Sequence, residues 1–129
     1  MQNLTIPATA ETPEILFSAS DRNLRIQGES YPENAMAFYA PVRAWLQSYL
    51  TEESDDLTEV HFSLKYFNSS STKLLRSLIA MLDDAARAGK RITTYWYHDP
   101  EDDMMMEFGQ DLQEEFTALN VQVTPLELA

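Results

Sequence analysis

The stretch VHFSLKYFNSSSTKLLRSLIAML, residues 60–82, decides the fold because its hydrophobic period changes halfway along. The first part alternates between apolar and polar side chains, which is typical of a β-strand with one buried face. The apolar positions of this strand are Val60, Phe62, Leu64 and Tyr66. In the second part, apolar residues recur at the spacing of an amphipathic helix, which we predict over residues 70–88. The apolar face of that helix would consist of Leu75, Leu78, Ile79 and Leu82.

A polar turn joins the predicted strand to the predicted helix. It consists of Asn68 followed by four hydroxyl residues, Ser69, Ser70, Ser71 and Thr72. The N-terminus of a helix has unpaired backbone N–H groups and a partial positive charge, and Asn or Ser caps it well. Capping is therefore one explanation of the turn. Because one cap needs only one residue, the other explanation is a covalently attached phosphate, an anion that a helix N-terminus stabilises.

The composition predicts one folded domain over residues 1–129. The chain has 129 residues, of which 44% are hydrophobic, enough for a sizeable core. Its formal net charge of −12 argues against nucleic acid and anionic membrane surfaces as partners, because both require a basic footprint.

The sequence carries no signal of export or membrane insertion. The start, MQNLTIPATAETPE, lacks the basic and apolar regions of a signal peptide, and no apolar run approaches the roughly 20 residues of a membrane span. We therefore expect a cytoplasmic protein.

The segment before residue 60 predicts three short strands and a helix. Residues 4–6 form a possible edge strand, and residues 15–18 and 24–28 are expected to pair as a hairpin. A helix over residues 33–50 would be capped by Ser30 or Tyr31, with Pro32 in its first turn. Pro41 predicts either a bend or the start of a second helix near Ala40, and we favour the bend.

The segment after residue 88 predicts a strand, a helix and a final strand. Residues 92–97 are rich in β-branched and aromatic residues. Asp99 as a cap and Pro100 as the first helical residue predict a helix start that continues as a helix over residues 102–117. Val121 and Val123 indicate the last strand.

This order of elements predicts an α/β fold with a mixed sheet. Two strand–helix–strand connections imply parallel strands in the centre, flanked by the N-terminal hairpin. Clean alternation in the central strand indicates that one face of the sheet is not covered. We therefore expect about three helices packed mainly on one face.

The sequence offers little support for catalysis or metal binding. No His–Asp pair is placed to form a triad with Ser69, and neither His61 nor His98 has a second His at ligand spacing. The absence of cysteine excludes a disulfide or a thiolate site. We expect no catalytic residue, metal or cofactor; the alternative is a small hydrolase or transferase that uses the hydroxyl cluster.

Three segments resemble the SiaC family of regulatory phosphoproteins. They are GESYPEN at residues 28–34, YFNSSSTK at residues 66–73 and the pair Trp96-Tyr97. The resemblance implies a fold like that of the STAS domain. It also implies a phosphorylation switch that is set by a serine/threonine kinase and reset by a PP2C-like phosphatase. The unphosphorylated form would bind and stimulate a diguanylate cyclase, which raises cyclic di-GMP and favours biofilm.

The resemblance also implies the phosphorylation site, and the residues around it are candidates for partner contact. The family's phosphorylated hydroxyl follows the Asn of the turn, which here is Ser69, with Ser70, Ser71 and Thr72 as alternatives. The residues expected to contact a partner are Tyr31, Asn34, Tyr66, Phe67, Asn68, Lys73 and Leu74. A classical anti-sigma-factor antagonist is the alternative function, although its Asp-Ser-Ser-Gly-like turn is replaced here by Asn68 without a glycine.

Overall fold

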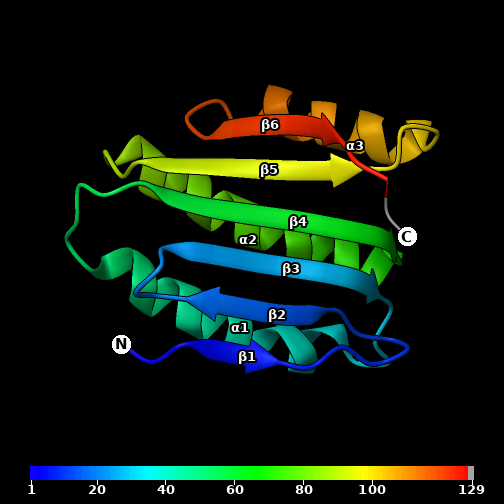
Figure 1. The fold of residues 1–129 in the computed structure, drawn as a ribbon, viewed down its shortest axis with the longest axis horizontal. Coiled ribbons are helices and arrows are strands. Elements are labelled where there is room, and N and C mark those ends of the chain that lie inside the picture. Colours follow the sequence, from blue (N-terminus) through cyan, green and yellow to red (C-terminus); the bar gives the residue numbers. More distant parts are fainter. Residues whose placement is uncertain (128–129) are drawn as a thin grey trace.

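The computed structural model describes residues 1–127 of the chain and contains six strands and three helices in the predicted order (Figure 1). The strands are β1 (Leu4–Ile6), β2 (Glu14–Ser18), β3 (Asn23–Ser30), β4 (Thr58–Phe67), β5 (Ile92–His98) and β6 (Asn120–Pro125). The helices are α1 (Ala35–Thr51), α2 (Ser69–Arg87) and α3 (Asp103–Glu115). Within residues 1–127, no helix has an apolar stretch long enough to cross a bilayer.

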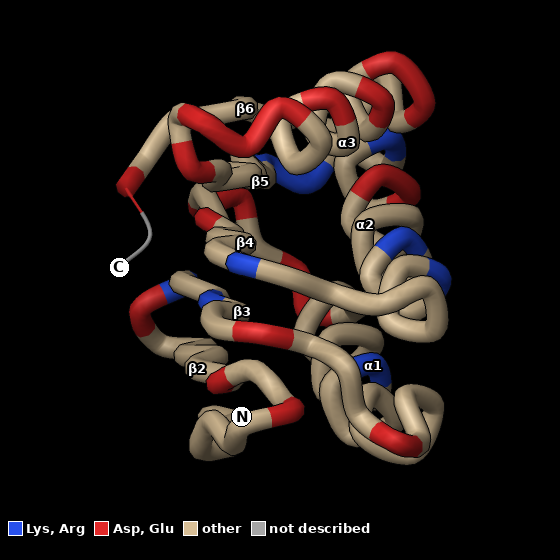
Figure 2. The backbone as a smooth tube through the Cα atoms, turned by 90° about the vertical axis from the view of Figure 1, so that its right-hand side faces the viewer, with Lys and Arg blue, Asp and Glu red and all other residues tan. Residues whose placement is uncertain are grey.

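The six strands form one mixed sheet in the order β1-β2-β3-β4-β5-β6. β1, β2 and β3 pair antiparallel, whereas β3 to β6 run parallel. Each parallel connection moves to the next strand in the same direction, so crossovers of the usual hand place every helix on the same side. Figures 1 and 2 show all three helices on one face of the sheet, which confirms the predicted α/β architecture and its N-terminal hairpin.

The hydrophobic core lies between the sheet and the helical layer. Alternate residues of the strands and one face of each helix are buried there, as the two periodicities require. Trp96 on β5 and Tyr39 on α1 are the largest fully buried side chains. The predicted apolar face of α2 is confirmed, because it is buried along its whole length at Leu75, Leu78, Ile79 and Leu82.

Helix α1 begins later than the sequence predicts. Neither Ser30 nor Tyr31 is the cap, since Ser30 is the last residue of β3 and Asn34 is the N-cap. The Asn34 side chain accepts a hydrogen bond from the Ala37 backbone N–H at 3.1 Å. The prediction was wrong because Pro32 fits a first helical turn but lies in the preceding loop, and a better capping residue follows it.

Pro41 lies inside an uninterrupted α1. A second helix does not begin near Ala40, so that alternative is wrong. The Pro41 ring is exposed, whereas Tyr39 and Val42 beside it are buried. One missing backbone hydrogen bond is tolerated here because the buried face of the helix packs on both sides of the proline.

Helix α3 also begins later than its first acidic residues suggest. Asp99 does not cap the helix; its carboxylate accepts the Glu101 backbone N–H at 3.0 Å, closing a short turn around Pro100. Asp102 is the N-cap and accepts the Met105 backbone N–H at 3.0 Å. Asp99 and Asp102 have the same capping chemistry. Because the Asp99 side chain is used in the turn around Pro100, Asp102 is the residue that caps the helix.

Strand β4 contains one extra residue that the alternating pattern does not reveal. Gly28 pairs with Leu64, but the next residue of β3, Glu29, pairs with Tyr66, so Lys65 has no partner. Such a bulge reverses the direction of the side chains that follow it. Tyr66, predicted to be buried, is therefore 51% exposed, and Phe67 packs towards the core instead, against Trp96 and Phe108.

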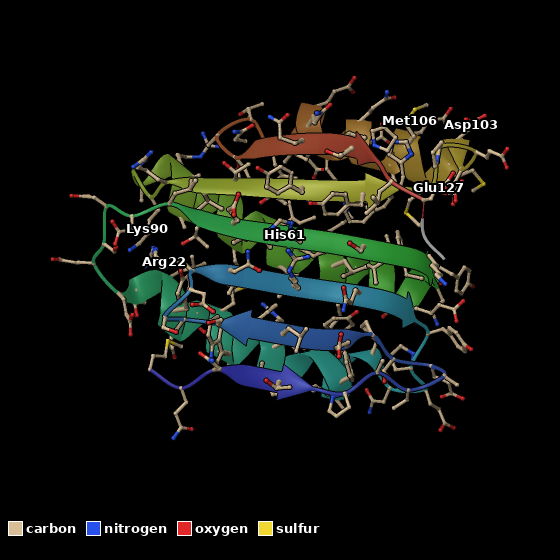
Figure 3. All side chains as sticks on the ribbon, in the orientation of Figure 1. Arg22, His61, Lys90, Asp103, Met106 and Glu127 are labelled. Atoms are coloured by element: carbon tan, nitrogen blue, oxygen red, sulfur yellow. The ribbon has the colours of Figure 1, made fainter. Side chains whose placement is uncertain are left out.

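The uncovered face of the sheet carries an aromatic row. The His61 ring lies parallel to those of Tyr95 and Tyr97, with centroids 4.9 and 5.8 Å away. Its Nδ1 is 2.9 Å from the Tyr97 hydroxyl oxygen. Figure 3 shows His61 near the middle of this face, where its neighbours leave it only 7% exposed. Burial first, and then the charge of Arg25, lower the pKa of His61 below its ordinary 6.5.

The first prediction concerns Gly109 on α3. A Cβ at this position would lie 2.6 Å from Trp96 Cδ1 and 3.0 Å from Val123 Cγ2. An exposed Gly-to-Ala change in a helix stabilises by about 1 kcal/mol, but overpacking of the core costs about 1–3 kcal/mol. Gly109→Ala should therefore lower the free energy of unfolding measured in urea. Gln110→Ala, an exposed change on the same helix, should stay within about 0.5 kcal/mol of wild type. A Gly109→Ala protein more stable than wild type would contradict the packing.

The second prediction concerns pH. Because the pKa of His61 is lower in the folded protein, the unfolded chain binds more protons once the pH falls below 6.5. The contribution of His61 to stability is thus complete above that pH and is lost as the pH falls towards its folded pKa. Urea unfolding between about pH 7.5 and about pH 5.5 should show a steeper loss for wild type than for His61→Gln. Parallel pH profiles would contradict this prediction.

Candidate functional site

The candidate site is the turn between the end of β4 and the start of α2. It lies at the C-terminal ends of the parallel strands (Figure 2). Asn68 is the N-cap of α2, and its side-chain oxygen accepts the Ser71 backbone N–H at 3.0 Å. Its own backbone N–H donates to the Ser30 carbonyl oxygen at 3.0 Å. Asn68 and Asn34, both expected to contact a partner, therefore use their side chains to cap two neighbouring helices.

The structure separates the four hydroxyl residues of the turn. Ser69 and Ser70 are exposed at the first two positions of α2. Ser71 is fully buried, and its hydroxyl oxygen accepts a hydrogen bond from the Ser30 hydroxyl at 2.8 Å. Thr72 is half-buried and donates to the Asn68 carbonyl oxygen at 3.1 Å. A modifying enzyme can therefore reach Ser69 and Ser70 in the folded chain, whereas Ser71 is enclosed.

The Ser30–Ser71 hydrogen bond belongs to a buried chain of three hydroxyls. The Ser30 hydroxyl oxygen also lies 2.6 Å from the Tyr39 hydroxyl oxygen on α1, and all three side chains are fully buried. Burial raises the pKa of Tyr39 to about 12, so the phenol is protonated at neutral pH. These three residues connect β3, α1 and α2. The sequence analysis did not predict these hydrogen-bonded hydroxyls, although Ser30 lies in the GESYPEN stretch.

The exposed aromatic residues of the site form a pair. Tyr31 follows β3 and Tyr66 lies near the end of β4, and their rings meet edge to face with centroids 5.8 Å apart. They are 36% and 51% exposed, so both can contact a partner. Phe67, also expected at the interface, is half-buried against Trp96 and Phe108 and supports the turn from below.

An open groove of about 880 Å³ runs between α1 and α2 and begins at the hydroxyl turn. Ser69, Ser70, Lys73 and Leu74 line it from α2, so two of the residues predicted to contact a partner, Lys73 and Leu74, lie in this groove. The α1 side and the loop before it contribute Glu33, Asn34, Ala35, Met36, Ala40, Arg43, Ala44 and Gln47.

Sequence reasoning did not assign any α1 residue of this groove to the site, apart from the cap Asn34. The sequence offered one indication of this groove. Met36 is apolar but lies outside the buried face of α1, and its side chain is 74% exposed in the structure.

The groove is basic in an acidic protein. Arg43 and Lys73 line its two sides, while the whole chain carries a formal charge of −12. In the part of the chain that the structure describes, neither side chain forms an ion pair. Figure 2 shows blue segments on α1 and α2, with red segments prominent on α3 and the loops. Lys73, one turn after Ser69 on α2, is the cation closest along the helix to an anionic group at Ser69 or Ser70, while Arg43 and Glu33 line other parts of the groove.

The two histidines take part in the sheet. His61 lies in the aromatic row of the uncovered face, and His98 is buried with its Nδ1 2.9 Å from the Asp99 carbonyl oxygen. Among residues 1–127, no three His, Asp or Glu side chains gather in a way that could hold a metal ion. The groups that distinguish this site are therefore exposed hydroxyls, cations and aromatic rings.

Comparison with known proteins places the chain in a family. Residues 6–126 match the model of the SiaC family of regulatory phosphoproteins. The chain is 30% identical over 115 residues to an uncharacterized protein of Pseudomonas aeruginosa strain UCBPP-PA14, a match that covers 89% of this chain and 90% of that protein.

Solved structures give the same answer. The chain is similar to SiaC in the crystal structure of the diguanylate cyclase SiaD in complex with its activator SiaC from Pseudomonas aeruginosa, with a TM-score of 0.88. Identity is 26%, and the match covers 95% of this chain and 99% of SiaC. A second structure of SiaC matches with a TM-score of 0.80 and 26% identity, over 100% of this chain and 98% of the other. The resemblance seen in the sequence is confirmed over nearly the whole chain: this protein belongs to the SiaC family of regulatory phosphoproteins.

Proposed function

We propose that this protein binds and stimulates a diguanylate cyclase, and that phosphorylation of Ser69 releases the cyclase. The observation that carries the proposal is the similarity, at a TM-score of 0.88, to a SiaC chain that was crystallised as the activator of the cyclase SiaD. The protein would act by contact, without catalysis of its own. Its site supports that role because it presents an exposed aromatic pair and an open groove, two features that suit contact with a partner.

Ser69 suits a switch because it is exposed and precedes the other hydroxyls in α2. A serine/threonine kinase would transfer phosphate from ATP to it. The Ser69 hydroxyl oxygen forms a bond to the γ-phosphorus, the bond from that phosphorus to ADP breaks, and the hydroxyl proton passes to a base of the kinase. A PP2C-like phosphatase would hydrolyse the ester and restore the hydroxyl. ATP and a kinase imply a cytoplasmic site of action.

The fold should tolerate the phosphate. It adds about 1.5 to 2 negative charges and three acceptor oxygens at the start of α2, where unpaired N–H groups and the helix dipole favour an anion. Lys73, one turn along α2 and in the same groove, would offset part of the charge. We therefore expect the phosphate to change the free energy of binding to the partner and to leave the free energy of unfolding nearly unchanged.

An interface at this turn should not tolerate the phosphate. Tyr31, Tyr66 and Leu74 give the site an apolar part that suits a dry contact. A charge that is buried in such a contact without a matching partner group costs several kcal/mol in lost hydration. Since each 1.4 kcal/mol is about a factor of ten in affinity, a fraction of that cost is enough to release the cyclase.

The third prediction tests the switch with charge-mimicking variants. Ser69→Asp should weaken binding to the cyclase by about tenfold or more, whereas Ser69→Ala should bind like wild type. The cyclase can be obtained from an extract of the source organism by pull-down with the unphosphorylated protein, identified by mass spectrometry and purified. Its affinity would be measured by calorimetry and its activity by the production of cyclic di-GMP from GTP. Circular dichroism should show all variants equally folded.

Ser70→Asp is the matched control, because Ser70 is also exposed and lines the same groove. A smaller effect than that of Ser69→Asp assigns the switch to Ser69. If only Ser70→Asp releases the cyclase, the assignment to Ser69 is wrong. If the wild-type protein neither binds nor stimulates any diguanylate cyclase of its organism, the proposed function itself is wrong.

A further inference from the structure

Ser30 holds the hydroxyl turn at two points. Its carbonyl oxygen accepts the backbone N–H of the cap Asn68 at 3.0 Å, and its hydroxyl donates to the Ser71 hydroxyl oxygen at 2.8 Å. Ser30 is fully buried and therefore cannot exchange these bonds for water. Its third contact, with the Tyr39 hydroxyl at 2.6 Å, ties the same point to α1. One residue of β3 thus contacts both the cap and the first turn of α2.

The bulge in β4 sets this contact. Because Lys65 is unpaired, Ser30 pairs with Phe67 and lies beside Asn68. Gly28 lies opposite the register shift with a φ of +121°, a conformation that side chains rarely adopt. The GESYPEN stretch therefore contains both the glycine of the irregular pairing and the serine that holds the turn. Its last residue, Asn34, caps α1 beside the same groove.

Ser71 lies on the buried face of α2, and its contact with Ser30 anchors the first turn of that face. Successive residues of an α-helix are about 100° apart around the axis. With Ser71 pointing inwards, the two preceding residues must point away from the core, and Ser69 and Ser70 are indeed exposed while Ser71 is not. Loss of the Ser30–Ser71 bond would remove this anchor, and local opening of the first turn would then bring the enclosed hydroxyl to solvent more often.

We infer that Ser30 is a positioning residue that restricts which hydroxyls can be phosphorylated: with Tyr39 it encloses Ser71 and leaves Ser69 and Ser70 exposed. The inference rests on the proposed phosphorylation and adds the element that determines its site. Ser30 does not touch the kinase or the reacting phosphorus. It acts by withholding one of several chemically equivalent hydroxyls, all of which could otherwise attack the γ-phosphorus in the same reaction.

Two variants break the buried chain of hydroxyls, one at its centre and one at its end on α1. Ser30→Ala deletes the central hydroxyl and keeps the backbone contact to Asn68, and Tyr39→Phe deletes only the hydroxyl on α1. Tyr49→Phe is the matched control, since Tyr49 lies on the same helix, is 4% exposed and loses a comparable buried bond to Thr58 at 2.7 Å. A purely structural role of Ser30 predicts the same general destabilisation in all three.

Amide hydrogen exchange separates local from general effects. The Ser71 and Thr72 amides are bonded to Asn68 and report on the first turn of α2. Ser30→Ala should speed their exchange by about tenfold more than Tyr49→Phe does, with Tyr39→Phe in between. Equal exchange in Ser30→Ala and Tyr49→Phe would overturn the inference. If Ser30→Ala does not fold, Tyr39→Phe serves for the same comparison.

The second measurement is the position of the phosphate. Each protein is incubated with ATP and an extract of the source organism, and the phosphorylated residue is identified by mass spectrometry. Wild type and Tyr49→Phe should carry phosphate on Ser69 alone, whereas Ser30→Ala should also carry it on Ser71. An unchanged position in Ser30→Ala would overturn the inference. A wild-type protein without phosphate in this turn would contradict the proposed switch instead, and hydrogen exchange would then decide the role of Ser30.

Discussion

The unpaired Lys65 in β4 is the constraint on which the rest of the site depends. It reverses the side chains that follow, so that Tyr66 faces solvent and Phe67 packs under the turn. It also brings Asn68 beside Ser30, where the backbone N–H of the cap finds its acceptor. A regular strand would bury Tyr66 and expose Phe67, and α2 would begin at a different place relative to β3.

The layered fold provides a rigid base for this turn. Because β3, β4 and β5 are consecutive parallel strands, α1 and α2 lie side by side on one face of the sheet. Their first turns therefore lie together at the C-terminal ends of β3 and β4 (Figures 1 and 2). Asparagine caps both helices, and a buried chain of hydroxyls connects them. The phosphate that we propose would meet, at the start of α2, helix N–H groups that favour an anion. Such a site can change what it binds without a change of fold, which suits a regulatory phosphoprotein.

The charge distribution also supports a local switch on an unchanged fold. The protein is strongly acidic, yet Arg43 and Lys73 line the groove that begins at Ser69. Lys73, one turn from Ser69, would reduce the cost of the proposed phosphate for this chain, but a partner that covers the turn would still have to remove the water around it. The switch that we propose therefore needs no large movement: a local charge at an exposed helix start is sufficient.

The sequence by itself determined the order of the elements, the hairpin, the buried face of α2 and the hydroxyl turn, because these depend on periodicity and local capping chemistry. Only the tertiary structure decided that Ser69 is exposed and Ser71 enclosed, since the partner of Ser71 lies 41 residues away in β3. The same holds for Tyr66, whose exposure depends on pairing with another strand, and for Asn34, which replaces Ser30 as the cap of α1. Arg43 entered the site for a similar reason: periodicity shows which face of a helix is buried, but only packing shows which exposed residues of two helices line a common groove.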